Sequence, residues 1–412
     1  MSAVVITQCR VCGGSNLRKV LSLGNQPLAN ALKTSADEAE QRYPLTLMYC
    51  DECGLVQIAE TVDKAELFSH YVWVTGTSEA ARRFARQFFD LATHVRPLAG
   101  QDLVIEIASN DGTFLKPFIE SGARAIGVDP AANIAEIANA AGIQTKCAFW
   151  DRGAARDILA SEGQAMLVVA RNVIAHVSEL HEVVGAIGEV LHTSGVAAIE
   201  FHAANSILDG LQYDSIYHEH LCYFSATSFA RLLELHGLHP FHVESSPISG
   251  GAHIIYAAPT PRKPSAQYAA LLKREHADGV VSRDAWLDFG QRCVAHRDLS
   301  RTLISRFAGC SVIGFGASAR SATYLNYCGF SREEITAVID NSPLKQGYFT
   351  PGSSIPIVSA EHGFALDPDL VFVLGWNFKD EIIDACKRRG YRGEFLVPFP
   401  DTPHLVSQSG TT

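Results

Sequence analysis

The chain has 412 residues, which is too long for one ordinary hydrophobic core and predicts two or three domains. Hydrophobic residues make up 47% and charged residues 19%, as in a globular enzyme, and the net charge is −10. Because nucleic acids and anionic membranes attract concentrated Lys and Arg, neither is expected as a partner of this acidic chain.

Membrane insertion and secretion are not expected either. No apolar stretch reaches the roughly 18 residues of a membrane helix, and the N-terminus lacks the pattern of a signal peptide. Ten cysteines are far fewer than in a disulfide scaffold of this length. We therefore expect a cytoplasmic protein whose cysteines are reduced thiols or metal ligands.

Two cysteine pairs mark the first segment, residues 1–70. They are Cys9-x-x-Cys12 and Cys50-x-x-Cys53, and a glycine follows each pair. Four thiolates match tetrahedral Zn²⁺ with no position left open for chemistry, so the predicted site is structural. A redox motif would need only one pair, and chance clustering is the other interpretation. The zinc would stabilise a domain too small to fold by burial alone.

The second segment, residues 71–260, alternates strand and helix patterns, which predicts a parallel, doubly wound sheet. Helical periodicity covers Ala80–Leu91 and Ile134–Ala141. A later strand over His253–Ala257 is expected at an antiparallel edge. The strand-like runs before it are Leu103–Ile107, Ala125–Val128, Met166–Val169 and Val196–Phe201.

The first of these strands runs into a turn of small residues that ends at Gly112, which is the layout of a cofactor loop. Glu106 is an acidic residue in an apolar strand, and it would offset the cationic methionyl end of S-adenosylmethionine. Asp129 ends the next strand, where a carboxylate accepts hydrogen bonds from ribose hydroxyls. A generic strand–helix turn is the alternative. The candidate cofactor contacts are Glu106, Ser109, Asn110, Gly112, Asp129 and Asn172.

A cluster of polar residues follows later in this segment, at Tyr217-His218-Glu219-His220, and His176 lies after an earlier strand. A histidine paired with a carboxylate is suited to act as a general base near neutral pH. The other interpretations are a hydrogen-bonded core network and, less favoured, a second metal site, for which little beyond Glu219 and Cys222 lies near His218 and His220.

A proline-bearing stretch, Pro259–Pro264, precedes the third segment, residues 261–412. A long helical pattern runs from about Ser265 to Phe307. Strand-like runs at Ser311–Phe315, Ile335–Ile339 and Leu370–Leu374 then predict a second α/β unit. Its turn contains Gly314 and Gly316, which allow a phosphate to approach a helix N-terminus. Further candidate contacts of this unit are Arg320, Asp340, Lys345 and Trp376.

The order of these motifs resembles that of the sugar C-methyltransferases of deoxysugar pathways, such as the C-3′-methyltransferase of D-tetronitrose biosynthesis. The resemblance covers essentially the whole chain. The motifs that carry it are the two cysteine pairs around Leu23–Asn30, the Glu-x-x-Ser-Asn-Asp-Gly loop from Glu106, the Tyr-x-Glu-His run leading to Phe224–Ser228, Gly250-Gly251, and Gly314–Ala319.

The resemblance implies an N-terminal zinc domain, a central S-adenosylmethionine-binding domain and a C-terminal Rossmann-like domain that helps hold a nucleotide-sugar. It places His220 as the base of the active site. Glu219 would orient or bind, and His176 would lie near the substrate. The family's active-site positions fall on Tyr71, His176, Tyr217, Glu219 and His220. The implied substrate contacts are Asn25, Gly314, Gly316, Ser318, Arg320, Lys345 and Trp376.

The implied reaction is methylation of a carbon beside the ketone of a nucleotide-linked 4-keto-deoxysugar, with C-3 expected. His220 would remove the proton, and the enolate would attack the sulfonium methyl. Two alternatives differ in class: a nucleotide-sugar dehydrogenase or epimerase, and a non-enzymatic adaptor built on the zinc domain. We expect a monomer, because three domains suffice to cover the cleft.

Overall fold

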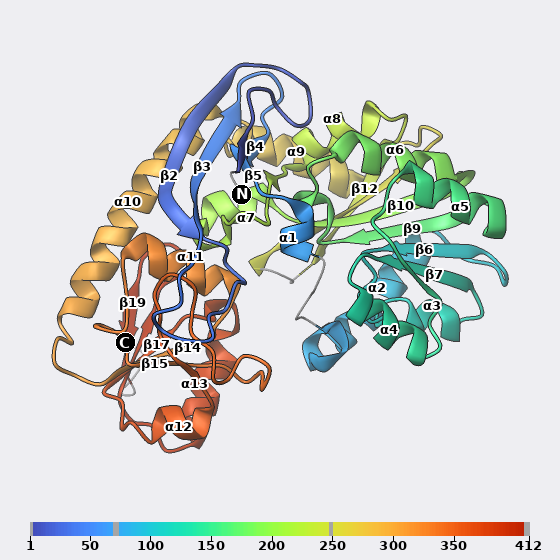
Figure 1. Ribbon diagram of the computed structural model, residues 1–412. Coiled ribbons are helices and arrows are strands. Elements are labelled where there is room, and N and C mark those ends of the chain that lie inside the picture. The colour runs from blue at the N-terminus through green and yellow to red at the C-terminus, as the bar shows by residue number, and fades with distance from the viewer. Residues whose placement is uncertain (1–2, 69–73, 247–249, 408–412) are drawn as a thin grey trace.

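The computed structural model describes residues 3–68, 74–246 and 250–407, and these form two large sheets and two smaller ones. Figure 1 shows the N-terminal strands above the C-terminal unit, with the central sheet to their right. The predicted α/β class, with a small N-terminal domain before two α/β units, is confirmed. The limits of the three domains remain predictions. Among the described residues, no helix is long and apolar enough to span a membrane.

The N-terminal sheet has four strands in the order β11-β4-β3-β2. Side chains of β3 alternate between buried and more exposed, as expected for a sheet with one packed face. Its last strand, β11, comes from the central segment of the chain and pairs antiparallel with β4. The strands are β2 (Leu17–Pro27), β3 (Arg42–Cys50), β4 (Val56–Ile58) and β11 (Cys222–Tyr223), and β1 (Val4–Val5) pairs with β5 (Glu60–Thr61).

The central sheet has seven strands in the order β12-β13-β10-β9-β6-β7-β8. Strands β6 to β10 pair in parallel, and β13 pairs antiparallel with β10 and β12. The strands are β6 (Leu103–Ile107), β7 (Arg124–Asp129), β8 (Thr145–Cys147), β9 (Ala165–Arg171), β10 (Leu191–His202), β12 (His239–Ser246) and β13 (Ala252–Ala258).

The expected edge strand over His253–Ala257 is antiparallel, as predicted, but it lies inside the sheet as β13. The edge is formed by β12, which was not predicted, because Pro240 and its polar neighbours conceal the strand pattern. The helices of this region are α1 (Lys64–Phe68), α2 (Glu79–Val95), α3 (Lys116–Glu120), α4 (Ala132–Ala140), α5 (Arg152–Glu162), α6 (Leu180–Val190), α7 (Ala204–Asp209) and α8 (Ala226–Glu234).

The long helical pattern after Ser265 is two helices, α9 (Ala266–Ala277) and α10 (Arg283–Ser305). The break falls at Gly279, whose φ of +75° does not continue a helix. Helix α10 runs along the N-terminal strand β2 toward the C-terminal unit (Figure 1). A Cβ on its Gly290 would lie 2.4 Å from the carbonyl oxygen of Val20, so the helix and strand backbones are in close contact.

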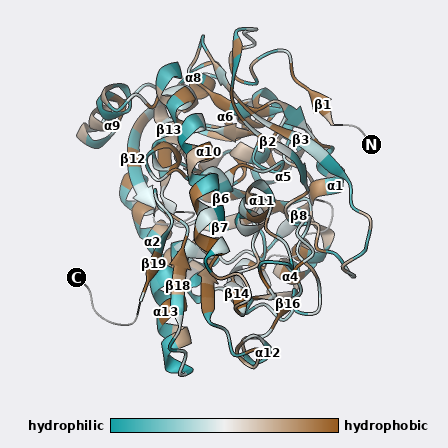
Figure 2. Ribbon diagram, turned by 90° about the vertical axis from the view of Figure 1, so that its left-hand side faces the viewer, coloured by the Kyte–Doolittle hydropathy of each residue, from teal (hydrophilic) through white to brown (hydrophobic). Residues whose placement is uncertain are grey.

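The C-terminal sheet has six strands in the order β16-β15-β14-β17-β18-β19, all parallel except β19. Figure 2 shows hydrophilic and hydrophobic residues on its helix α13, whose buried side holds Ile382 and Cys386. The elements are β14 (Val312–Phe315), β15 (Ala337–Ile339), β16 (Ile357–Val358), β17 (Leu370–Val373), β18 (Glu394–Val397), β19 (His404–Val406), α11 (Ala319–Cys328), α12 (Ala360–Phe364) and α13 (Lys379–Arg388).

Candidate active site

The four predicted zinc ligands lie together. The Sγ atoms of Cys9 and Cys53 are 3.6 Å apart, those of Cys12 and Cys50 are 3.6 Å apart, and all four lie within 4.8 Å of one another. Tetrahedral zinc with Zn–S bonds of about 2.3 Å places its sulfurs about 3.8 Å apart, so the cluster fits the ion. It is the only group of three or more potential metal-ligating side chains among the described residues.

Both cysteine knuckles have the same turn. Gly13 and Gly54 each have a φ of +71° and donate a hydrogen bond of 3.0 Å to the carbonyl of the first cysteine of their pair. The amide of Gly14 donates to the Cys12 sulfur at 3.4 Å. In both knuckles the glycine therefore lets the backbone turn back to the first cysteine, and in the first knuckle an amide then faces a ligand sulfur.

The predicted cofactor loop follows β6 at the carboxyl edge of the central sheet. The Glu106 carboxyl and the Ser109 hydroxyl are buried, and among the described residues Glu106 Oε2 and Ser109 Oγ have no hydrogen-bond partner. Gly112 has a φ of +77°, and a Cβ there would lie 2.6 Å from Ile143. Unpaired buried polar atoms around a turn that only glycine permits fit a polar ligand such as S-adenosylmethionine.

Asp129 lies across the loop at the end of β7. Its carboxylate accepts hydrogen bonds from the backbone amides of Asn110 at 2.9 Å and Ala131 at 3.0 Å. A carboxylate has about four acceptor sites, so two remain for ribose hydroxyls. Asn172 follows β9 at the same edge and has a φ of +49°. Its backbone amide donates to the Glu200 backbone carbonyl at 2.9 Å. All six predicted cofactor contacts therefore lie at one edge of the sheet.

A short turn that the sequence did not indicate contacts this loop. The amide of Thr75 donates to Asn110 Oδ1 at 2.8 Å, and the amide of Gly76 donates to Asp111 Oδ2 at 2.9 Å. A Cβ on Gly76 would lie 2.4 Å from that carboxylate oxygen. In the sequence, only Gly76 could have indicated this contact, because only glycine allows so close an approach. Tyr71, a predicted active-site residue shortly before the turn, lies outside the described residues.

Replacing Glu106 with glutamine is expected to weaken S-adenosylmethionine binding about 10- to 100-fold, the value of one hydrogen bond to a charged group. Burial raises the pKa of Glu106 to about 8, although Arg171 opposes the shift. A bound cation favours the carboxylate, so binding near pH 7 should release a proton from the wild type. Calorimetry in buffers of different ionisation enthalpy measures this release. Glu136→Gln, on the exposed face of α4, is the control. If Glu106→Gln released as many protons as the wild type, the assignment of Glu106 would be wrong.

Of the predicted catalytic residues, His176, Tyr217 and His220 come together between β9 and β11. The hydroxyl of Tyr217 lies 2.8 Å from Nε2 of His220, and the rings of His220 and His176 are 4.6 Å apart, edge to face. His220 Nδ1 lies 2.9 Å from the Ser215 carbonyl oxygen. Because a carbonyl only accepts, Nδ1 carries the proton. The Nε2 lone pair then accepts from Tyr217, which is the tautomer that a general base requires.

Burial lowers the pKa of both histidines. The pKa of His220 lies well below its ordinary value, mainly through burial and then through the neighbouring His176 and His202. Burial lowers the pKa of His176 to about 4. Both imidazoles are therefore neutral at pH 7. His220 can then accept a proton at its unprotonated nitrogen, and His176 can polarise a neighbouring oxygen without carrying a charge.

Glu219 faces the N-terminal domain. Its Oε1 accepts a hydrogen bond of 2.7 Å from Asn30, which lies in the loop between β2 and β3. Burial raises the pKa of this carboxyl to about 7, and the Asn30 bond opposes that shift. Asn30 belongs to the Leu23–Asn30 motif, but nothing in the sequence pairs it with Glu219. Asn25, the predicted contact in the same motif, is exposed on β2 opposite Pro44.

Two predicted substrate contacts of the C-terminal unit bind the central segment. Arg320 donates to both carboxylate oxygens of Asp214, at 2.9 and 2.8 Å, and Trp376 Nε1 donates to the same carboxylate at 2.7 Å. The Arg320 guanidinium also lies 4.8 Å from the Trp376 ring centroid. Asp214 is 1% exposed and lies beside Ser215, which holds His220. This cluster therefore binds the C-terminal unit to the start of the segment Ser215–His220, which we call the histidine loop.

The other predicted contacts of that unit surround the turn after β14. Gly316 has a φ of +106°, and Ser318 caps α11 by accepting from the Ser321 amide at 3.2 Å. Asp340 accepts from the Ala317 amide at 2.9 Å, as Asp129 does from Asn110 in the central unit. Lys345 donates to the Ala317 carbonyl at 2.7 Å. Gly314 lies in β14 itself, where a Cβ would meet Leu374 at 2.7 Å.

The chain matches three family models in order. They are described as a zinc binding domain over residues 9–68, a methyltransferase domain over residues 79–243 and a C-methyltransferase C-terminal domain over residues 247–400. The C-methyltransferase NovU of Streptomyces niveus is 34% identical over 413 residues, covering 98% of both chains. The chain belongs to the C-methyltransferase family. It is an S-adenosylmethionine-dependent C-methyltransferase with a structural zinc site, and it acts on a small molecule.

Some solved structures are similar to part of this chain. Magnesium protoporphyrin IX methyltransferase from Synechocystis, with bound S-adenosylmethionine, is 12% identical, covers 43% of this chain and 78% of its own, and has a TM-score of 0.33. The PH0226 protein of Pyrococcus horikoshii is 16% identical, covers 48% and 98%, and has a TM-score of 0.36. The full-length match to a C-methyltransferase favours this class over the dehydrogenase and adaptor interpretations.

Proposed function

We propose that this C-methyltransferase methylates C-3 of a nucleotide-linked 4-keto-deoxysugar through an enolate. The observation that supports this most is the His220 imidazole, which is neutral, donates its Nδ1 proton to the Ser215 carbonyl and directs Nε2 toward Tyr217. A proton beside a ketone is removed only where a base and an oxygen-stabilising donor lie close together. His220 and Tyr217 are such a pair, with His176 beside them.

The steps assign one role to each side chain. His220 Nε2 takes the C-3 proton as the C–H bond breaks, and the electron pair moves onto the C-4 oxygen. The Tyr217 hydroxyl, released from His220, donates to that oxygen. S-adenosylmethionine, which the loop after β6 and Asp129 would hold, would supply the electrophilic methyl group for C-3. His176 supports the oxygen as a neutral donor, and Glu219 orients the sugar.

The substrate's nucleotide is assigned to the turn after β14. The N-terminus of α11, which favours an anion, follows the turn at Gly316, and the ammonium of Lys345 lies beside the same turn. Gly316 itself has a φ of +106°, and a Cβ there would meet the Gly375 backbone at 2.8 Å. Asp340 repeats the position that Asp129 has in the cofactor half, where a ribose is expected. The interaction of Arg320 and Trp376 with Asp214 would connect this half to the histidine loop. We also propose that the enzyme is a monomer.

The test is to incubate the enzyme with S-adenosylmethionine and a panel of dTDP- and GDP-linked 4-keto-6-deoxy sugars, following methyl gain by mass spectrometry. Methylation at C-3 of one member would support the proposal and identify the nucleotide. His218→Gln is a matched control, because His218 lies in the same loop but faces the Pro44 carbonyl at 3.0 Å. Bound cofactor with no methylation of any member would place the acceptor outside this sugar class.

Replacing Asn30 with alanine should move the acidic limb of the kcat/KM profile to higher pH, by up to about one unit for one lost hydrogen bond. The Asn30 amide donates to the Glu219 carboxylate and so favours its charged form. Without it, the pKa of Glu219 rises above its present value of about 7. Asn16→Ala is the control, because Asn16 makes a similar bond of 3.1 Å to the exposed Glu52. If the acidic limb of the Asn30→Ala profile did not move, the ionisation of Glu219 would not limit catalysis.

A further inference from the structure

Arg10 lies inside the first cysteine knuckle, and its side chain is hydrogen-bonded to the N-terminal strands β4 and β5. It is only 9% exposed. Its guanidinium donates to the carbonyls of Ile58 and Glu60, and to the Thr61 hydroxyl at 2.7 Å. Its backbone amide and guanidinium also share Gln57 Oε1, at 3.1 and 3.4 Å. All of these acceptors are uncharged oxygens on β4 and β5.

A buried guanidinium is costly unless it is fully hydrogen-bonded, and this one obtains its bonds from backbone and side-chain oxygens of two short strands. The planar fork holds several acceptors in fixed directions, which a lysine ammonium does not. Arg10 therefore fixes β4 and β5 relative to the knuckle between Cys9 and Cys12.

Strand β4 in turn holds the catalytic loop. The amide of Ile58, whose carbonyl Arg10 binds, donates to the Leu221 carbonyl at 3.0 Å. The Leu221 amide donates to the Ala175 carbonyl at 2.8 Å. Leu221 follows His220, and Ala175 precedes His176. The hydrogen bonds thus run from the knuckle through Arg10 and β4 to the chain neighbours of the two histidines, whose rings are 4.6 Å apart.

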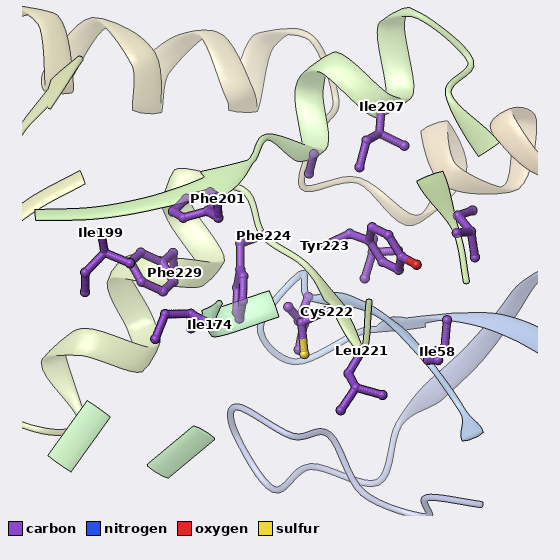
Figure 3. Close-up of a cluster of buried hydrophobic side chains, with 14 of the residues drawn as sticks. Ile58, Ile174, Ile199, Phe201, Ile207, Leu221, Cys222, Tyr223, Phe224 and Phe229 are labelled. Carbon is purple, nitrogen blue, oxygen red and sulfur yellow. The ribbon is translucent and has the colours of Figure 1, made fainter. Parts of the chain in front are cut away.

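The same segments share one hydrophobic core. Figure 3 shows Ile58 and Leu221 near Cys222, with Phe224 extending toward Phe201. The rings of Phe201 and Phe224 are 5.7 Å apart. Because close-packed interiors transmit displacements, a shift of β4 would be carried into the loop.

We propose that Arg10 is a positioning residue, which couples the cysteine cluster to the His176–His220 pair through β4 and β11. In this account the zinc domain does more than fold: it sets the distance between the two histidines. The inference rests on the proposed function of His220, but the coupling itself is measurable without any sugar substrate.

The test compares Arg10→Met with the wild type as full-length, zinc-loaded protein. Zinc content and S-adenosylmethionine affinity should be unchanged. Amide hydrogen exchange should accelerate in peptides covering residues 174–177 and 217–223. With a sugar that the wild type methylates, kcat should fall about 100-fold, as for a small misplacement of catalytic groups, with the KM for S-adenosylmethionine unchanged. Arg10→Lys should lie between the two.

Arg18→Met is the matched control, since Arg18 loses the same charge in the same domain but forms an exposed ion pair with Asp51. If Arg10→Met does not fold, Arg10→Lys carries the test. Full zinc content with wild-type exchange in both peptides would overturn the proposal, whichever sugar is used. Faster exchange, with no methylation of any sugar by the wild type, would leave the coupling standing and count against the proposed reaction alone.

Discussion

Replacing His220 with alanine is expected to lower kcat for methyl transfer by about 1000-fold, within the range of a lost general base. S-adenosylmethionine affinity should stay unchanged, because the cofactor contacts lie at the edge of the central sheet formed by β6, β7 and β9. The Nε2 atom that would take the proton faces Tyr217 at 2.8 Å, and only the neutral imidazole has that lone pair free. Single-turnover kinetics with saturating cofactor measures the step directly.

The pH dependence of the wild type provides a check on this assignment. Because burial holds the pKa of His220 well below its ordinary value, this base stays neutral through the acidic range in which an exposed histidine becomes protonated. Any loss of activity near pH 7 must then arise from another group, and Glu219, with a pKa of about 7, is the expected one. A wild-type kcat in the His220→Ala variant would show that His220 is not the general base.

Replacing Cys50 with serine is expected to unfold the N-terminal sheet and abolish activity. Structural zinc contributes roughly 10 to 16 kcal/mol in small zinc domains, which exceeds the stability of many whole domains, about 5 to 15 kcal/mol. The four sulfurs lie within 4.8 Å of one another, so loss of one opens the site. Strand β11, two residues after His220, pairs with β4 of this sheet and would lose its partner.

Zinc content and thermal unfolding of the two variants decide this prediction. Cys147→Ser serves as the control, because Cys147 is an exposed thiol at the end of β8, outside the cysteine cluster. The control should keep its zinc and its midpoint of unfolding. Zinc retained by Cys50→Ser, together with an unchanged midpoint, would mean that the cysteine cluster does not support the domain.

Local patterns predicted much of the fold. The alternation of apolar strands and helices identified the strands at the centre of both α/β sheets, and the paired cysteines identified the zinc cluster. The cofactor loop was visible because Glu106, Gly112 and Asp129 have fixed positions relative to their strands. Each of these signals depends on residues close in sequence, or on a motif whose spacing reports the ligand.

The missing parts depend on contacts between distant residues. Strand β11 has two residues and pairs with β4, so no local periodicity marks it. The bond from Asn30 to Glu219 joins residues 189 positions apart. Arg320 and Trp376 had the chemistry of ligand contacts, but the buried Asp214 binds both. Residue type predicted that these side chains would bind something polar, and only the fold shows that the partner is another segment of the chain.

The exchange of the α-proton with solvent tests the central claim most directly. The enzyme is incubated in D₂O with the methylatable keto-sugar and S-adenosylhomocysteine, which fills the cofactor site but has no methyl group to transfer. The account predicts deuterium at C-3 with the wild type and His218→Gln, and none with His220→Ala. Exchange that continues at the wild-type rate in His220→Ala would contradict the assignment of His220 as the base.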